Sequence, residues 1–145
     1  MKKTCSVYFR GDDIYVIASS KTTAGLWIDT EPRFKLTRPV SASHLGRTVI
    51  SALNGSREGV PTPDDLRSVG KELLHFVGFK SLSSFERGAI YFLVTLEENA
   101  INIIPTSRGT RGGFDFHASE AVYSNVNPDE LGETLMKLAL ERQGR

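Results

Sequence analysis

Apolar residues in the first forty positions come in short runs that are typical of β-strands. The runs at 5–9 and 14–18 flank Gly11-Asp12-Asp13, which has the chemistry of a turn, so we expect a β-hairpin. The second run is apolar on both faces and predicts an interior strand. A third extended segment contains residues 26–28 and 34–36. We expect Pro32 to interrupt it, because proline lacks the N–H that a sheet ladder needs.

Two segments have helical spacing and clear ends. The first is expected to begin at Ser41 or Ser43, which can cap it, and to end at Asn54-Gly55. Its apolar face contains Ala42, Leu45, Val49, Ile50 and Leu53. The last helix is expected to open at Asn127-Pro128, by the same capping logic. Its apolar positions are Leu131, Leu135, Leu138 and Ala139.

A further helix is predicted between these two. Thr62 is expected to cap it, with Pro63 at the first helical position and Asp64 and Asp65 at the positive end of the helix dipole. Gly78 is expected to end it. The predicted buried stripe contains Leu66, Val69, Leu73, Phe76 and Val77.

Residues 89–96 form a nearly continuous apolar run that predicts the central strand, buried on both faces. We therefore expect Tyr91, Leu93 and Ile17 at the centre of the sheet core. Glu97-Glu98-Asn99 turns the chain into a strand at 100–104. After a loop at 105–113, a half-buried strand follows at 114–117, and 121–123 extends it after a break. Strands thus come in groups and do not alternate with helices. This order predicts an α+β fold with a mostly antiparallel sheet of five to six strands and three packed helices.

The composition is that of a globular protein. The chain has 145 residues, of which 39% are hydrophobic and 24% charged, so we expect one domain spanning 1–145. Its start lacks the apolar stretch of a secretory signal, and its apolar runs are too short to span a membrane, which favours a cytoplasmic protein. Cys5 is the single cysteine, which excludes an intrachain disulfide and a cysteine-based zinc site.

The net charge of +1 argues against strong general affinity for nucleic acid. The charge is unevenly distributed, because residues 89–145 contain five basic and eight acidic side chains, a local balance of −3. This imbalance is either ordinary surface scatter or an acidic face that attracts a basic partner.

Few residues have the spacing of a catalytic or binding site. A Gly-x-Ser-x-Gly motif, a Walker loop and metal-ligand spacing around the three histidines are all missing from the sequence. His117 could act as a base beside Asp115, or form an ion pair with it. The loop at 107–113 is either a long hairpin loop or an anion site gripped by Arg108 and Arg111. Trp27 is either a core anchor or, if exposed beside Asp29 and Glu31, an interface hot spot.

Several stretches resemble the immunity proteins of contact-dependent growth inhibition systems. The stretch from Ser19 to Trp27 (SSKTTAGLW) resembles the start of these proteins. Phe85-Glu86-Arg87, and Pro105 followed by Gly112-Gly113-Phe114, are similar to later stretches of the same family. With the length and the element order, the resemblance covers nearly the whole chain.

The resemblance implies a cytosolic antidote that binds the C-terminal toxin domain delivered by a neighbouring bacterium and blocks its active site. Such toxins are often nucleases that cut transfer RNA. It implies no catalysis, no cofactor and no metal, and as partner a protein, not a membrane, nucleic acid or small-molecule substrate. Partner-binding residues are expected among the acidic positions of the C-terminal part and around the tryptophan: Glu97, Glu98, Asp115, Glu120, Trp27, Asp29 and Glu31. The alternatives are an RNA-binding or nucleolytic module built on residues 108–113, and a structural subunit of an oligomer.

Overall fold

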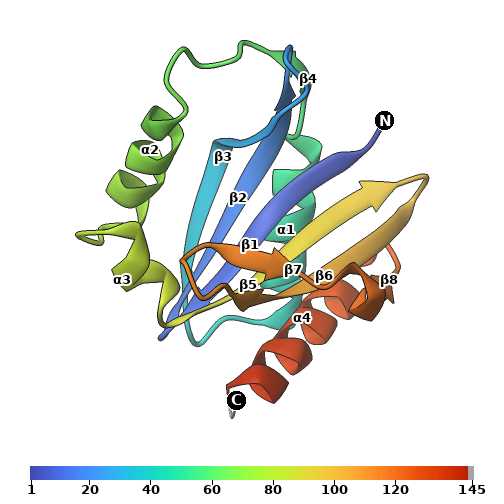
Figure 1. Cartoon of the computed structure of the whole chain (residues 1–145). Helices are drawn as coiled ribbons and strands as arrows, with labels where there is room; N and C mark the ends of the chain where they lie inside the picture. The colour runs from blue at the N-terminus through green and yellow to red at the C-terminus, as the bar shows by residue number, and fades with distance from the viewer. Residues whose placement is uncertain (144–145) are drawn as a thin grey trace.

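The fold is a single eight-stranded sheet with helices on both faces, seen in a computed structural model that describes residues 1–143 (Figure 1). The strands are β1 (Lys3–Arg10), β2 (Asp13–Thr22), β3 (Trp27–Thr37), β4 (Glu58–Val60), β5 (Ala89–Glu97), β6 (Ala100–Arg108), β7 (Phe114–Phe116) and β8 (Val122–Ser124). The helices are α1 (Ala42–Asn54), α2 (Arg67–Val77), α3 (Leu82–Glu86) and α4 (Pro128–Arg142), with a 3₁₀ turn η1 at Ala118–Glu120.

The main strand order is β3-β2-β1-β5-β6-β7, and all of these neighbours run antiparallel. β8 pairs with β6, and β4 pairs in parallel with β2. The predicted α+β class, the β1–β2 hairpin and the central place of β5 are therefore confirmed. The sequence understated the number of elements, because β4 and α3 are short and have no periodic signal of their own.

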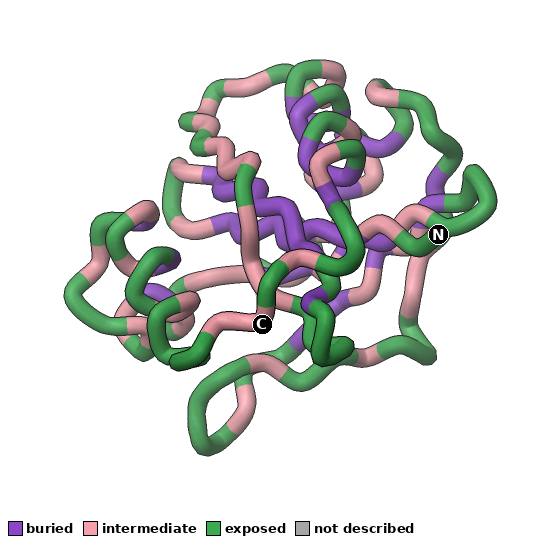
Figure 2. Tube along the Cα trace, turned by 90° about the horizontal axis from the view of Figure 1, so that it is seen from above, coloured by how far each residue is buried: buried purple, intermediate pink, exposed green. Residues whose placement is uncertain are grey.

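One face of the sheet, here called the closed face, packs against α1 and α4 and holds the main core. Its buried side chains include Val7, Val16, Val94 and Ile103 from the strands, and Leu45 and Leu135 from the helices. Figure 2 shows the buried residues concentrated along the central strands. Cys5 belongs to this cluster, and burial raises the pKa of its thiol well above the ordinary value. Burial thus disfavours the thiolate, the form in which a cysteine reacts.

Glycines allow α1 and α4 to cross with their backbones in contact. A Cβ atom at Gly46 would overlap the carbonyl oxygen of Pro128, and one at Gly132 would overlap that of Ala42. The caps of both helices are those predicted. The Ser41 hydroxyl accepts a hydrogen bond from the amide of His44, and the Asn127 side chain accepts one from Glu130.

The opposite face, here called the open face, is covered only at one end. There α2 and α3 lie over the sheet (Figure 1). They pack on an aromatic cluster that includes Tyr8, Tyr15, Phe85 and Tyr91. None of the helices in the described part of the chain covers the other end of this face (Figure 1). Leu93, which lies there, is therefore only half-buried, and the prediction that this strand is buried on both faces is wrong at that position.

β3 continues through Pro32, contrary to the predicted interruption. Two features explain the difference. β3 is an edge strand, where a missing N–H costs no ladder bond, and its register with β2 shifts between Ile17 and Ser19, opposite the proline.

α2 starts at Arg67, four residues beyond the predicted first position at Pro63. The Thr62 hydroxyl accepts a hydrogen bond from the amide of Ala24 and so ties this segment to the β2–β3 turn. Leu66 occupies the cap position instead, without a side-chain cap bond, and the Asp65 carboxylate before it accepts from the amide of Arg67. Leu66 consequently lies outside the buried stripe and is exposed. Among residues 1–143, helices long and apolar enough to span a membrane are absent.

Candidate functional site

Trp27 and Asp29 lie at the start of edge strand β3, two residues apart and so on the same face. That face is the open one, since Asp29 is paired with Ser19 and Trp27 with Lys21. Trp27 is 38% exposed, so the reading of this residue as a core anchor is wrong. The alternative, an exposed tryptophan beside Asp29 and Glu31, is what the structure contains.

These two side chains border a hollow on the uncovered end of the open face, here called the sheet cavity. Its volume is about 310 Å³. Strands β1, β2, β3, β5 and β7 all contribute to its wall, which consists of Lys2, Thr4, Ser6, Ser19, Trp27, Asp29, Tyr91, Leu93, Thr95 and Phe116. Phe116 is 53% exposed, which places aromatic surface on β7 as well as on β3. The cavity therefore combines a polar lining with aromatic residues that solvent reaches.

Asp29 is the acidic group of the sheet cavity. Burial raises its pKa to about 6, against the weaker lowering effects of the Arg33 charge and a hydrogen bond from Ser19. Among the described residues, Asp29 forms no ion pair. The Arg33 guanidinium instead contacts Glu72 at 2.9 Å and Glu31 at 3.9 Å. Asp29 therefore keeps a carboxylate in a partly desolvated position without a cation of its own.

The floor of the sheet cavity is made of hydroxyl groups. The Ser6 hydroxyl and the Tyr91 phenol are 2.9 Å apart and satisfy each other. The Thr4 residue is only 4% exposed, yet its hydroxyl has no hydrogen-bond partner within the described part of the chain. A buried hydroxyl without a partner carries a free-energy penalty that a bound polar group would relieve.

The four C-terminal acidic residues singled out by the sequence do not form one surface. Side chains alternate along β5, so Glu97 is on the open face with Leu93 and Thr95, and Glu98 follows in the β5–β6 turn. Asp115 pairs with Ser107 near the far end of β6. At ~3.3 Å per residue, the seven steps from Ala100 to Ser107 span roughly 23 Å. Asp115 and Glu120 are thus separated from the glutamates of the turn.

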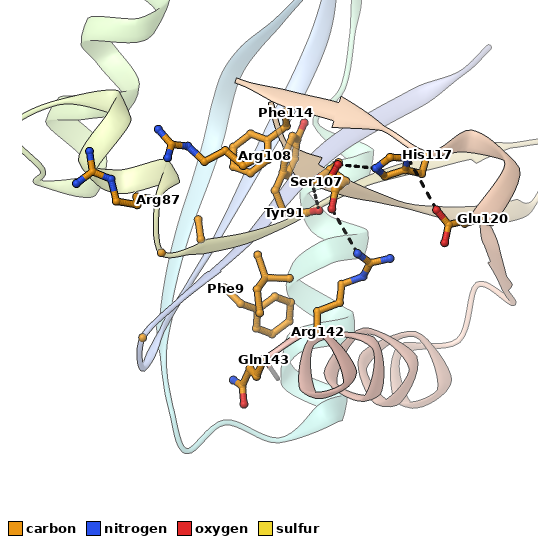
Figure 3. A pocket seen from close by; sticks show the side chains of 15 residues that line it. Phe9, Arg87, Tyr91, Ser107, Arg108, Phe114, His117, Glu120, Arg142 and Gln143 are labelled. Atoms are coloured by element: carbon orange, nitrogen blue, oxygen red, sulfur yellow. Dashed lines mark hydrogen bonds and ion pairs between the residues drawn. The ribbon is translucent and has the colours of Figure 1, made fainter. Parts of the chain in front are cut away.

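Glu120 instead borders a cleft rich in arginine, here called the arginine cleft, with a volume of about 580 Å³ (Figure 3). Arg87, Arg108 and Arg142 line it together with His117. Arg142 donates to the carbonyl of Thr106 at 3.4 Å, and Arg108 donates to the hydroxyl of Ser83 at 3.1 Å. Arg111, which the sequence paired with Arg108, does not line this cleft.

His117 contacts Ser107 and Glu120, and not Asp115 as the sequence suggested. Its Nε2 lies 2.6 Å from the Ser107 hydroxyl, and its Nδ1 lies 3.8 Å from the Glu120 carboxylate (Figure 3). The order serine, histidine, carboxylate is that of a hydrolytic triad. Ser107, however, lies within the hydrogen-bonded pairing of β6 with β7. Pro105–His117 and Gly109–Gly113, two residues away on either side, are both hydrogen-bonded pairs. Hydrogen-bonded and non-bonded pairs alternate along two antiparallel strands, so Ser107–Asp115 is a hydrogen-bonded pair as well, and the Ser107 N–H points to Asp115. That amide cannot serve an oxyanion.

Sequence reasoning missed the residues that complete both hollows. Thr4 and Phe116 in the sheet cavity, and Arg87 and Arg142 in the arginine cleft, come from distant parts of the chain. The pairing of β1 with β5 and of β7 with β6 brings Thr4 and Phe116 to the sheet cavity, whereas the ends of α3 and α4 bring Arg87 and Arg142 to the arginine cleft. Groups of three or more potential metal ligands are absent from residues 1–143.

Comparison with known proteins supplies the family. The family model for CDI immunity proteins matches residues 3–142. A search of curated proteins gave no match. Two solved structures share the fold. A protein of unknown function from Neisseria meningitidis is 19% identical with a TM-score of 0.78, and the alignment covers 98% of this chain and 95% of that one.

The second structure is described as a CdiA-CT/CdiI toxin and immunity complex from Yersinia pseudotuberculosis. It is 21% identical with a TM-score of 0.76, over 98% of this chain and 97% of that one. At these identities the likeness of the two structures establishes the fold alone, and the family rests on the model that spans nearly all of the sequence. On that evidence, the chain belongs to the family of CDI immunity proteins.

Proposed function

We propose that this protein binds the C-terminal toxin domain of its cognate CDI system in the cytoplasm and neutralises it. It acts by occupancy and not by catalysis, and it needs no cofactor or metal. The toxin we expect is a nuclease that cuts transfer RNA. The observation that carries the proposal is the uncovered end of the open face, where a polar cavity lies between exposed aromatic residues.

The physical reason is that protein interfaces concentrate their binding energy in aromatic and charged anchors that become desolvated on contact. Trp27 and Phe116 border the sheet cavity, and Tyr123, which is 75% exposed, is paired with Asn102 on the adjacent strand β6. Leu26 and Leu66 extend the apolar surface beside Trp27, around a neighbouring hollow. A monomer gains nothing from exposing this group of side chains, whereas a bound partner would bury them.

The direct test uses the toxin domain encoded beside this protein. Mixing the purified proteins should give a one-to-one complex by calorimetry and by size-exclusion chromatography with light scattering. Transfer RNA incubated with the toxin should be cleaved, and an equimolar amount of this protein should prevent cleavage. Absence of a complex, together with undiminished toxicity in cells that express the protein, would refute the proposal.

Two double variants locate the interface. Glu97 is on the open face, so Glu97→Ala/Glu98→Ala should slow association with a basic toxin and weaken its salt dependence. Asp115→Ala/Glu120→Ala is the matched control, because these carboxylates lie toward the arginine cleft. It should bind like the wild type. The reverse pattern would move the interface to the arginine cleft.

The convergence of three arginines favours one alternative function, RNA binding at the arginine cleft. That function would show a steep fall of RNA affinity with salt, lost in Arg108→Ala/Arg142→Ala. A nucleolytic version would also cleave transfer RNA and lose this activity in His117→Ala. We expect the purified protein to leave transfer RNA uncleaved and to show no salt-sensitive binding of it.

A further inference from the structure

We propose that the sheet cavity is the receptor for one basic side chain of the toxin, with its cationic end at Asp29 and Thr4 and its aliphatic stem between Trp27 and Phe116. The inference rests on the proposed function, since it names the group that the toxin would insert. It requires that the cavity have unmatched negative charge, a polar floor and apolar walls.

The charges around the cavity leave Asp29 as the unmatched one. Arg33 lies between two carboxylates of its own, Glu31 and Glu72. Lys2, at the exposed edge, is opposite Glu97 if the register of β1 with β5 is continued by one residue beyond Lys3–Leu96. Arg33 therefore shares its charge between Glu31 and Glu72, and Lys2 lies at the exposed rim of the cavity. Asp29, which lines the hollow, forms no ion pair among the described residues, and the Arg33 charge lowers its pKa less than burial raises it. The electrostatic complement of this carboxylate is therefore a cation.

The polar floor favours a ligand with several hydrogen-bond donors. Asp29 is an acceptor when ionised, and the Thr4 hydroxyl can accept as well as donate. Thr4 is buried and has no partner among the described residues, so a guanidinium or ammonium group would satisfy it. Hydrogen bonds that join a charged donor to a carboxylate are the strong kind, which suits an anchor.

The walls fit the remainder of such a side chain. Trp27 and Phe116 supply aromatic surface from the strands at the two edges of the sheet, β3 and β7. Leu93 lies between them on β5. Aromatic faces attract cations, and they also pack against the methylene groups of lysine and arginine. A volume of about 310 Å³ gives room for one long side chain and not for a helix or a strand.

The first experiment needs no toxin. Trp27 is the single tryptophan of the chain, so its fluorescence reports on this cavity alone. Titration with butylguanidinium should change the emission saturably, with a Kd on the order of millimolar, as for a fragment of this size. Asp29→Asn should weaken this binding by at least about tenfold, the loss expected for a charged hydrogen bond. Glu120→Gln makes the same chemical change outside the cavity and should leave the titration unaltered.

Butyrate, of similar length and opposite charge, should produce no saturable change. A titration curve for butylguanidinium that is linear, or equal in Asp29→Asn and wild type, would overturn the proposal. Tighter binding of butyrate would overturn it as well. Circular dichroism and the unfolding midpoint of each variant confirm that the fold is retained. Thr4→Val gives a second, independent test. It replaces only the hydroxyl, by a methyl group, and should weaken fragment binding several-fold.

The second experiment separates this inference from the proposed function. Asp29→Asn should raise the Kd for the toxin domain by at least about tenfold, mainly through faster dissociation, because the lost contact is buried in the complex. If wild type and Asp29→Asn bind the toxin equally, the anchor is refuted while neutralisation stands. If the wild type does not bind the toxin at all, the proposed function fails, and the fragment titration still decides what the cavity binds.

Discussion

Asp29 shows how a single residue can oppose folding and still be held in place. Its carboxylate is partly removed from water, and the nearby Arg33 is shared with Glu31 and Glu72. At neutral pH the Asp29 carboxylate is therefore ionised in a position where burial favours its neutral form. Residues with this property concentrate at binding and catalytic sites, where stability is exchanged for function.

Replacement of Asp29 should reveal that penalty as a function of pH. Its pKa rises from 3.8 to about 6 on folding, so the folded state binds the proton more tightly, and stability is lost as the pH rises through this interval. Arg33, Lys2, Tyr8 and Tyr91 are its charged or titratable neighbours. Asp29→Asn should gain about 1–3 kcal/mol relative to wild type between about pH 4 and pH 7. Urea denaturation at several pH values measures the gain, with Asp115→Asn as a control that should show none.

Ser56 supports the same site from below. It is 3% exposed, its hydroxyl accepts from the amide of Thr4, and it donates to the carbonyl of Ser19. It therefore joins β1 and β2 where both border the sheet cavity. Ser56→Ala leaves a buried amide and a buried carbonyl without this partner and should cost about 1–3 kcal/mol in chemical denaturation. Ser51→Ala, on an exposed position of α1, should change stability by less than about 0.5 kcal/mol.

At the scale of elements, the contact between α1 and α4 depends on the absence of two side chains. Gly46 and Gly132 let each helix approach a backbone carbonyl of the other. Because the obstacle is backbone, it cannot turn aside as a flexible side chain does. The pair of helices that covers the closed face is thus fixed in its crossing geometry by composition as well as by hydrophobic burial.

Gly132→Ala should accordingly destabilise the protein by roughly 2 kcal/mol or more, since overpacking typically costs about 1–3 kcal/mol and here the helices must separate. The matched control is Gly70→Ala in α2. There an added Cβ would meet the end of Leu82 at 3.3 Å, a side chain that can shift. The gain in helix propensity should then leave Gly70→Ala neutral or more stable by up to about 1 kcal/mol. Thermal unfolding of both variants compares them, and equal midpoints would contradict the close contact.

The helices and strands with strong periodicity could be predicted from the sequence, and those set by tertiary contacts could not. α1 and α4 begin at the caps that their sequence contains, Ser41 and Asn127. The Thr62-Pro63 signal fails because Thr62 bonds to the β2–β3 turn instead of to a helix. Pro32 fails as a strand breaker because no strand of residues 1–143 pairs with the outer edge of β3. Neither the contact of Thr62 with the β2–β3 turn nor the edge position of β3 can be predicted from the neighbouring residues.

At the scale of the molecule, the two faces of one sheet have different tasks. The closed face holds the core, whereas one end of the open face is left to solvent and to the sheet cavity. Charge segregation could be predicted from the sequence, but not its arrangement. The residues Glu97, Asp115 and Glu120, which share an acidic segment, lie in different regions, while Trp27 and Phe116 converge.

Substitutions at two adjacent residues of β5 compare the contributions of the two faces to stability. Val94 is buried on the closed face, and Leu93 is half-buried on the open face. Val94→Ala should cost about 2–4 kcal/mol, as expected for a core truncation. Leu93→Ala removes a larger side chain but should cost less, and it should weaken toxin binding by altering the cavity wall. If Leu93→Ala proves the more destabilising of the two, the uncovered end of the open face is closed in solution.

The α1–α4 glycine contact also constrains how such a protein can diversify. It lies behind the sheet, on the side away from the sheet cavity, so substitutions that alter Trp27, Leu93 or Phe116 leave it untouched. Mutations at distant sites without shared partners have nearly additive effects on stability. A lineage could therefore exchange the lining of the cavity, and with it the partner it recognises, while the scaffold behind it stays the same. On the proposed function, the residues that determine specificity and those that form the main core lie on opposite faces of one sheet.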